Sequence, residues 1–272
     1  DALLDGVWWP TAGSDADFWK IRVPAFRRWL QTQPESHIVA VGHGGFFEAM
    51  TGGRKLENCE TYELPLEALP TRTVLVDMDG VLCDFEGQFL RCWREAHPAA
   101  EWLPMEQRRS HYVDLDPSGV YDTARSHAVI TSPGFYETMP PIEGAITALT
   151  QIDALDGVHV CICTAPFGNG KIAEQCEAEK RAWVESNLGK DWLAPSKFIC
   201  VKDKTGVPGD LLIDDKPEPS KHWKHKKVAK PTWKHVLFTQ PFNVDDPACK
   251  GKPRLACWPN WEQVILPLIR DL

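Results

Sequence analysis

Short apolar runs alternate with helical patterns along most of the chain. Five of these runs are predicted strands, at residues 73–77 (TVLVD), 158–164 (VHVCICT), 197–201 (KFICV), 210–215 (DLLIDD) and 235–239 (HVLFT). Between and after them, apolar residues repeat on a helical period over 145–155, 174–188 and 260–270. Strands that alternate with helices are typical of a parallel sheet with helices on both faces. The predicted fold class is therefore α/β.

The first seventy residues follow a different pattern. A helical repeat runs from about 15 to 33, and a short strand is predicted at 37–41 (HIVAV). Pro65 and Pro70 separate this part from the first strand of the α/β region. We therefore expect a short α/β segment at 1–70 and a larger domain at 71–272.

Polar residues stand at the end of four predicted strands. In a parallel sheet the carboxyl ends of the strands lie along one edge, where such proteins bind their ligands. Any one of these residues alone is typical of a helix cap or a solvated surface. Together they predict one site, made of Asp77, Asp79, Thr164, Lys202, Lys204, Asp214 and Asp215.

Phosphoryl transfer is the chemistry that fits this set. Three close carboxylates favour a hard divalent cation, above all Mg²⁺, which takes oxygen ligands. One carboxylate is expected to attack phosphorus and form an aspartyl-phosphate, while a second protonates the leaving alcohol and later activates water. A lysine and a threonine would hold the phosphoryl oxygens.

Composition excludes several other classes. The formal net charge is −8, whereas general nucleic-acid binders need excess Lys and Arg. No apolar run approaches the roughly 20 residues of a membrane span, so direct membrane insertion is not expected. The nine cysteines include no CxxC pair, which favours reduced thiols in an intracellular compartment. The Lys- and Pro-rich stretch 216–234 is predicted to be a solvated loop, with a basic phosphate-binding patch as the alternative.

Ordered motifs over about 72–270 resemble one branch of the haloacid dehalogenase (HAD) superfamily, the 5'(3')-deoxyribonucleotidases. The motifs are VLVDMDGVLCDFEGQFLRCW, EQRR, VCICTAP, EKRAWVE, KDKT, DLLIDDKP, TWKHVLFT and NWEQVIL. The resemblance implies a HAD-like Rossmannoid parallel sheet with a small helical cap at about 86–141. It also implies a Mg²⁺-dependent phosphatase of nucleoside monophosphates.

The acidic residues take their roles from this resemblance. Asp77 would be the nucleophile and a metal ligand, and Asp215 a further metal ligand. Asp79 would be the general acid and base and would give the metal its backbone carbonyl. Asp214 would support Asp215.

The resemblance also implies the substrate-binding residues. Thr164 and Lys204 would bind phosphate, and Lys202 stands where the family has an arginine near the substrate. Phe85 matches an aromatic residue that packs on the substrate base, although plain core packing explains it equally well. Lys180 has a counterpart in the family, but no role is assigned to it.

Besides Lys202, four positions depart from the family pattern. An aromatic pair of the cap is His111 and Tyr112 here, a pocket tryptophan is replaced by Ile130, and Ala165 stands where a serine is expected. These departures leave two alternatives open: a phosphatase for another small phosphomonoester, or a former enzyme that serves as a structural subunit of a larger complex.

The stretch HIVAVGHGGFFEAMTGGRKLENCETYEL in the first seventy residues resembles the back half of a histidine phosphatase (phosphoglycerate mutase-like) domain. His43 would be the second histidine of that site, but no Arg-His-Gly precedes it. We therefore expect this fragment to be non-catalytic. It would also lack sheet partners, which favours a protein partner or a homodimer through residues 1–70. Related nucleotidases work in the cytosol and in mitochondria, and the sequence does not distinguish these compartments.

Overall fold

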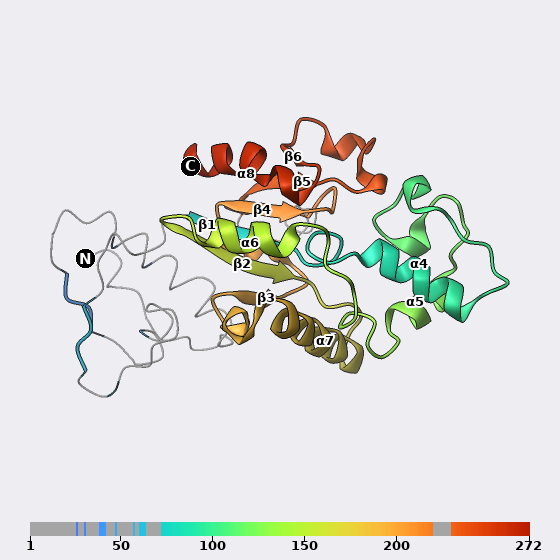
Figure 1. The fold of residues 1–272 in the computed structure, drawn as a ribbon, viewed down its shortest axis with the longest axis horizontal. Helices are drawn as coiled ribbons and strands as arrows, with labels where there is room; N and C mark the ends of the chain where they lie inside the picture. The colour runs from blue at the N-terminus through green and yellow to red at the C-terminus, as the bar shows by residue number, and fades with distance from the viewer. Residues whose placement is uncertain are drawn as a thin grey trace. The chain divides into compact units, whose positions relative to one another are not determined.

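The fold is seen in a computed structural model of the chain (Figure 1). The structure describes residues 72–219 and 230–272, together with residues 38–41, 60–63 and Phe26, Leu30, Phe47 and Glu57. The chain divides into two compact units, Asp1–Leu69 and Pro70–Leu272. The helices and strands named below belong to the second unit.

A six-stranded parallel sheet forms the centre of this unit. The strands lie in the order β3-β2-β1-β4-β5-β6, and each pairs with its neighbours in parallel. Their bounds are β1 Arg72–Val76, β2 Val158–Thr164, β3 Phe198–Cys200, β4 Leu211–Asp214, β5 Lys234–Phe238 and β6 Arg254–Leu255. The α/β prediction is confirmed, and the five predicted strands are present. The sixth, β6, was missed because two residues are too few to show a periodic pattern.

Three helices accompany the sheet: α6 (Ala145–Asp153), α7 (Lys171–Leu188) and α8 (Trp261–Arg270). The helix predicted at 174–188 begins three residues earlier, because its first turn is polar or exposed and carries no apolar repeat. The core holds large side chains whose polar atoms are satisfied. Trp183 Nε1 donates to Met139 O at 2.7 Å, and Trp258 Nε1 donates to Val81 O at 2.6 Å.

Helices α4 (Phe85–Ala96) and α5 (Thr123–Ile130) pack together beyond the carboxyl ends of the strands (Figure 1). Asp84 caps α4 by accepting from Gly87 N at 2.9 Å, and Asp122 caps α5 by accepting from Arg125 N at 2.9 Å. Two short 3₁₀ turns, Met105–Gln107 and Val113–Leu115, lie between the helices in the chain. These elements form what we call the cap, which stands over the edge where the polar residues were predicted.

Only a few of the first seventy residues are described. Phe26 and Leu30 are helical, as predicted, but residues 38–41 form no strand, so the strand predicted at 37–41 is wrong for those four residues. Val39 and Val41 are exposed. A short apolar run alone does not make a strand without a paired neighbour. His43 lies outside the described residues. The same holds for most of the residues that carry the histidine phosphatase resemblance and the predicted protein partner or homodimer contact.

Among the described residues, no helix has both the length and the apolar character needed to cross a membrane.

Candidate active site

Asp77 lies directly after β1 and is nearly buried. Its backbone N–H continues the ladder by donating to Ile213 O at 2.9 Å. Both of its carboxylate oxygens have partners. Met78 N donates to Oδ1 at 2.7 Å, and Lys204 Nζ lies 2.8 Å from Oδ2. The carboxylate is thus fixed at the edge of the sheet, with a cation beside it.

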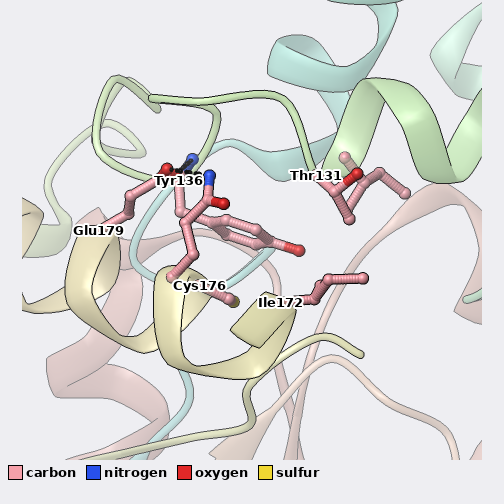
Figure 2. Close-up of a pocket in the computed structure, with 7 residues that line it drawn as sticks. Thr131, Tyr136, Ile172, Cys176 and Glu179 are labelled. Carbon is pink, nitrogen blue, oxygen red and sulfur yellow. Dashed lines mark hydrogen bonds between the residues drawn. The ribbon is translucent and has the colours of Figure 1, made fainter. Parts of the chain in front are cut away.

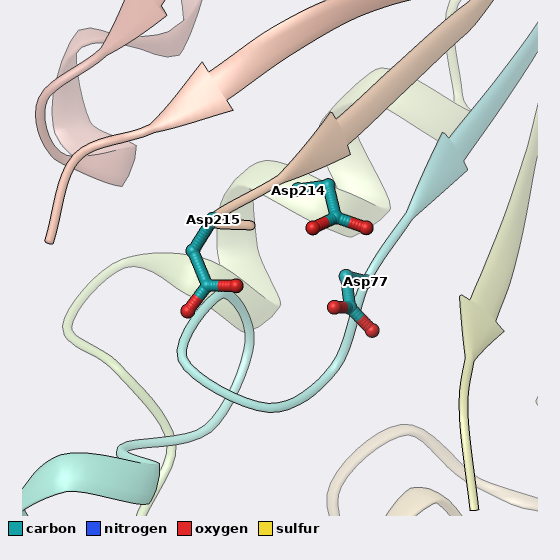
Figure 3. A group of neighbouring side chains, drawn as sticks. All are labelled: Asp77, Asp214 and Asp215. Atoms are coloured by element: carbon teal, nitrogen blue, oxygen red, sulfur yellow. The ribbon is translucent and has the colours of Figure 1, made fainter. Parts of the chain in front are cut away.

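Asp214 and Asp215, where β4 ends, complete a group of three acids with Asp77 (Figure 3). One ligand oxygen of each acid lies within 4.8 Å of the others. We call these three residues the acid cluster. Parallel pairing of β1 with β4 brings the two strand ends together, as the sequence predicted.

The two neighbouring acids of β4 have different surroundings. Asp214 Oδ2 accepts from Lys204 Nζ at 2.6 Å, and Asp214 Oδ1 accepts from Lys216 N at 2.8 Å. Asp215 Oδ1 is buried and makes no hydrogen bond within the described part of the chain. The oxygens of Asp214 are therefore engaged, while Asp215 has an oxygen available for a ligand.

Burial and mutual repulsion shape the ionisation of the acid cluster. Burial raises the pKa of Asp77 to about 6, with Lys204 opposing the shift and Asp214 adding to it. Burial, and then the charge of Asp214 and Asp77, raises the pKa of Asp215 well above its usual range. Burial alone would also raise the pKa of Asp214, but Lys204 and the hydrogen bonds of Asp214 outweigh it, so the net shift is downward.

This arrangement fits a divalent cation. An all-oxygen donor set suits Mg²⁺, and Asp215 Oδ1 is a buried oxygen that needs a partner. A bound cation would offset both the burial and the mutual repulsion that raise the pKa of Asp77 and Asp215. Asp77 and Asp215 are the side chains best placed to hold it, and Asp214 the one best placed to support them.

Gly80 makes room for Asp215. Its φ is +70°, and a Cβ at this position would lie 2.2 Å from Asp215 Oδ2. Gln240 Nε2 holds the turn by donating to Gly80 O at 2.6 Å. Both the positive φ and the close approach to Asp215 therefore require glycine at this turn.

Lys180, to which the sequence assigned no role, joins two predicted site residues. Its side chain is fully buried, and Nζ donates to Asp79 Oδ2 at 2.8 Å, Thr164 Oγ1 at 2.8 Å and Ala165 O at 2.7 Å. The sequence did carry a signal for this residue. Lys180 lies on the same helical face as the buried Cys176, Trp183 and Val184. A lysine on the apolar face of a helix needs buried partners.

Two predicted substrate residues contact other parts of the molecule. Lys202 is exposed, and its Nζ donates to Gly168 O and to Asn169 Oδ1, the latter at 2.6 Å. Phe85 is half-buried and packs edge-on against Phe135, with ring centroids 5.6 Å apart. Their substrate contacts therefore stay predictions.

The two altered cap residues lie against the end of β4. His111 Nδ1 is 3.7 Å from Asp215 Oδ1, and Lys216 Nζ donates to Tyr112 Oη at 2.9 Å. Burial, and then the charge of Lys216, lowers the pKa of His111 to about 4. The imidazole is therefore neutral at neutral pH.

The altered position Ile130 lines a small pocket between the cap and α7 (Figure 2). Tyr136 lies in this pocket, and its ring centroid is 5.2 Å from Lys180 Nζ. Glu179 Oε1 accepts from Gly134 N at 2.9 Å and Glu179 Oε2 from Tyr136 N at 3.1 Å, which ties this loop to α7. The pocket shares no residue with the acid cluster.

The described residues thus form a parallel α/β sheet with three acids clustered at the ends of β1 and β4. The sequence model of the family described as 5' nucleotidase, deoxy (pyrimidine), cytosolic type C protein (NT5C) matches residues 71–270. The chain belongs to this family of phosphoric monoester hydrolases.

Curated relatives are similar over the same part of the chain. A Bordetella pertussis protein provisionally named a 5'(3')-deoxyribonucleotidase is 39% identical over 192 residues, which cover 71% of this chain and 94% of that protein. The human cytosolic-type 5'(3')-deoxyribonucleotidase is 37% identical over 198 residues, covering 71% of this chain and 92% of its own length. The human mitochondrial enzyme is also 37% identical, covering 71% of this chain and 81% of its own length.

Among solved structures, a protein from Lactobacillus delbrueckii subsp. bulgaricus, provisionally named a phosphoglycolate phosphatase, aligns with a TM-score of 0.47. Its identity is 11%, over 72% of this chain and 98% of that one.

Proposed function

We propose that this chain is a Mg²⁺-dependent phosphatase that hydrolyses deoxyribonucleoside or ribonucleoside monophosphates through an aspartyl-phosphate on Asp77. The observation that carries the proposal is the setting of Asp77. Its carboxylate lies at the sheet edge beside Lys204 and within the acid cluster. The names of the relatives support the nucleotide as substrate.

In the first half-reaction, an oxygen of Asp77 attacks phosphorus, and the bond between phosphorus and the ester oxygen breaks. Asp79 gives its proton to the leaving oxygen. Lys204 lies 2.8 Å from Asp77 Oδ2 and offsets negative charge on the phosphoryl oxygens.

In the second half-reaction, Asp79 takes a proton from water, the water oxygen attacks phosphorus, and the bond to Asp77 breaks. Free phosphate leaves and the carboxylate of Asp77 is restored. Thr164 contributes a hydroxyl proton to a phosphoryl oxygen, because its Oγ1 lone pair already accepts from Lys180. A bound cation would supply positive charge to the phosphoryl group and shield it from the acids.

The test is phosphate release from dUMP or dTMP with Mg²⁺ and with excess EDTA. We expect Asp77→Asn to lose turnover, whereas the exposed Asp245→Asn is the matched control and keeps the wild-type rate. Equal activity of Asp77→Asn and the wild type, or full activity in EDTA, would overturn the mechanism.

A second candidate substrate is a small phosphomonoester without a nucleobase. His111, Tyr112 and Ile130 favour it, because they change the cap where the family pattern is aromatic. A panel of nucleotides and phosphorylated sugars separates the two substrate classes. Family membership and the complete acid cluster favour an enzyme over a non-catalytic subunit.

The remaining proposals concern the surroundings of the enzyme. The names of the two human relatives support a cytosolic or mitochondrial location. The histidine phosphatase origin of residues 1–70 and a partner or homodimer contact through them rest on sequence resemblance. They are tested by the mass of the full chain in solution, compared with that of residues 71–272.

A further inference from the structure

Two buried polar atoms face each other between the cap and the sheet. His111 Nδ1 comes from the cap and Asp215 Oδ1 from the end of β4, and 3.7 Å separates them. Neither atom makes a hydrogen bond with any described residue. A buried polar group without a partner costs about 1–3 kcal/mol, so two such groups in one place indicate a polar ligand that satisfies both.

The position of the His111 ring is set by several contacts. Phe242 packs edge-on at 5.5 Å between ring centroids, and Tyr112 does the same at 4.9 Å. Two consecutive cap residues contact the two residues that follow β4. His111 faces Asp215, and Tyr112 Oη accepts from Lys216 Nζ at 2.9 Å. The cap loop is therefore held against the end of β4.

A buried ion network within the cap also holds this loop. Arg108 is 2% exposed and pairs with Glu86 Oε2 at 2.5 Å and with Asp116 Oδ2 at 3.3 Å. Its Nη2 also donates to Ser110 O at 3.0 Å, one residue before His111. The loop that carries His111 is thus fixed by buried charges of the cap.

The geometry fits neither a direct hydrogen bond between His111 and Asp215 nor ligation of a cation by His111 together with the whole acid cluster. The gap of 3.7 Å to Asp215 exceeds the roughly 2.7–3.2 Å of a hydrogen bond. His111 is also not among the residues whose ligand atoms all lie within 4.8 Å of one another. The imidazole approaches the acid cluster from the Asp215 side.

We propose that His111 Nδ1 hydrogen-bonds an oxygen held by the cation at Asp215. This oxygen belongs to a water in the free enzyme and to the phosphoryl group when substrate replaces that water. The inference rests on the proposed function, because it assumes a cation at the acid cluster. It gives the altered cap residue a role in holding the cation and the substrate.

The experiment measures cation binding to the full chain without substrate, by titration calorimetry with Mg²⁺ and by the electron paramagnetic resonance of bound Mn²⁺. His111→Phe keeps a ring of similar size but removes both nitrogens. Groups that hydrogen-bond the oxygens around a cation typically change its affinity 10–100-fold. We therefore expect His111→Phe to bind both cations at least about tenfold more weakly.

Three further variants keep the test decisive. His111→Asn places an amide group near the Nδ1 position, so it should retain most of the affinity. His111→Gln places its amide further out, so it should behave like His111→Phe. Leu115→Ala changes an exposed side chain of the same cap, and its cation affinity should equal that of the wild type. The comparison of Asn with Gln holds even if the Phe variant folds poorly.

Wild-type affinity in His111→Phe and His111→Gln would overturn the inference, as would an Asn variant as weak as the Gln variant. Failure of the proposed function has a different signature. In that case the wild-type chain itself would bind neither cation or would hydrolyse no phosphomonoester. If the wild type binds the cation and turns over while all His111 variants match it, only the role of His111 is wrong.

Discussion

Replacing Lys180 with methionine tests how the site is held together. The side chain is fully buried, and its three N–H groups are all donated, to Asp79, Thr164 and Ala165. Burial favours the neutral amine, but the charge of Asp79 outweighs it and raises the pKa of Lys180. Lys180→Met keeps the apolar stem and removes the charge and all three hydrogen bonds.

The stability effect follows from the acceptors left behind. Removing one partner of a buried ion pair costs about 3–5 kcal/mol, and each buried acceptor left unpaired costs about 1–3 kcal/mol. The Asp79 side chain is 27% exposed, so water can solvate part of its charge. We therefore expect the free energy of unfolding to fall by about 3 kcal/mol, at the lower end of the ion-pair range.

The effect on turnover has a separate cause. An ammonium group only donates, so Thr164 Oγ1 must accept from Lys180 and point its own proton elsewhere. Without Lys180, Thr164 and Asp79 both lose their fixed orientation. Positioned proton transfer contributes about 10²–10⁴-fold to a rate, so we expect kcat to fall at least about 10²-fold.

Urea unfolding followed by tryptophan fluorescence measures the first effect, and phosphate release measures the second. Arg181→Met is the control on the same helix, since Arg181 forms a partly exposed pair with Glu177 and should change stability by less than about 1 kcal/mol. A cycle with Thr164→Val should show coupling to Lys180. Strictly additive effects, or a Lys180→Met protein as stable and active as the wild type, would refute the reasoning.

Three other predictions follow from the cap and the acid cluster. Gly80→Ala should lower the free energy of unfolding by about 1–3 kcal/mol and weaken Mg²⁺ binding, because its Cβ would lie 2.2 Å from Asp215 Oδ2; thermal unfolding and calorimetry check this. Mg²⁺ at about 100 times its dissociation constant should stabilise the wild type by about 2.7 kcal/mol but not Asp215→Asn, and equal stabilisation of both would place the cation elsewhere. Burial raises the pKa of Glu86 from 4.5 to about 7, with Arg108 opposing the shift. The folded state therefore binds this proton more tightly, and stability from this group is lost as pH rises from about 4.5 through 7. Relative to Glu86→Gln, the wild type should lose up to about 3 kcal/mol between pH 4.5 and 8 in urea unfolding, and parallel pH profiles would contradict this.

The strand ends could be predicted from the sequence because each polar residue follows an unmistakable apolar run. Once the strands are parallel, Asp77, Asp214 and Asp215 must lie at one edge, and the structure brings them within 4.8 Å of one another. The sequence could not predict which acid oxygens accept hydrogen bonds within the protein and which remain available for a ligand. Lys204 engages Asp214, while Asp215 keeps a free oxygen.

The sequence did not predict the contacts of Lys180 and His111, for two different reasons. The sequence places Lys180 on an apolar helix face, which indicates buried partners. It does not identify those partners, because Asp79, for example, is 101 residues away. The place of His111 depends on an irregular loop fixed by the buried Arg108, and periodicity says nothing about such loops. Within the strand predicted at 37–41, the described residues 38–41 form no strand, because an apolar run does not by itself supply a pairing partner.

The central claim is that Asp77 carries the phosphoryl group during turnover. The most direct measurement is mass spectrometry of the chain after acid quench of a single turnover with dUMP and Mg²⁺. The account predicts a phosphoryl group on the peptide that contains Asp77, present at early times and lost as free phosphate appears. Release of phosphate at the wild-type rate with no phosphoryl group on Asp77 at any time would contradict it.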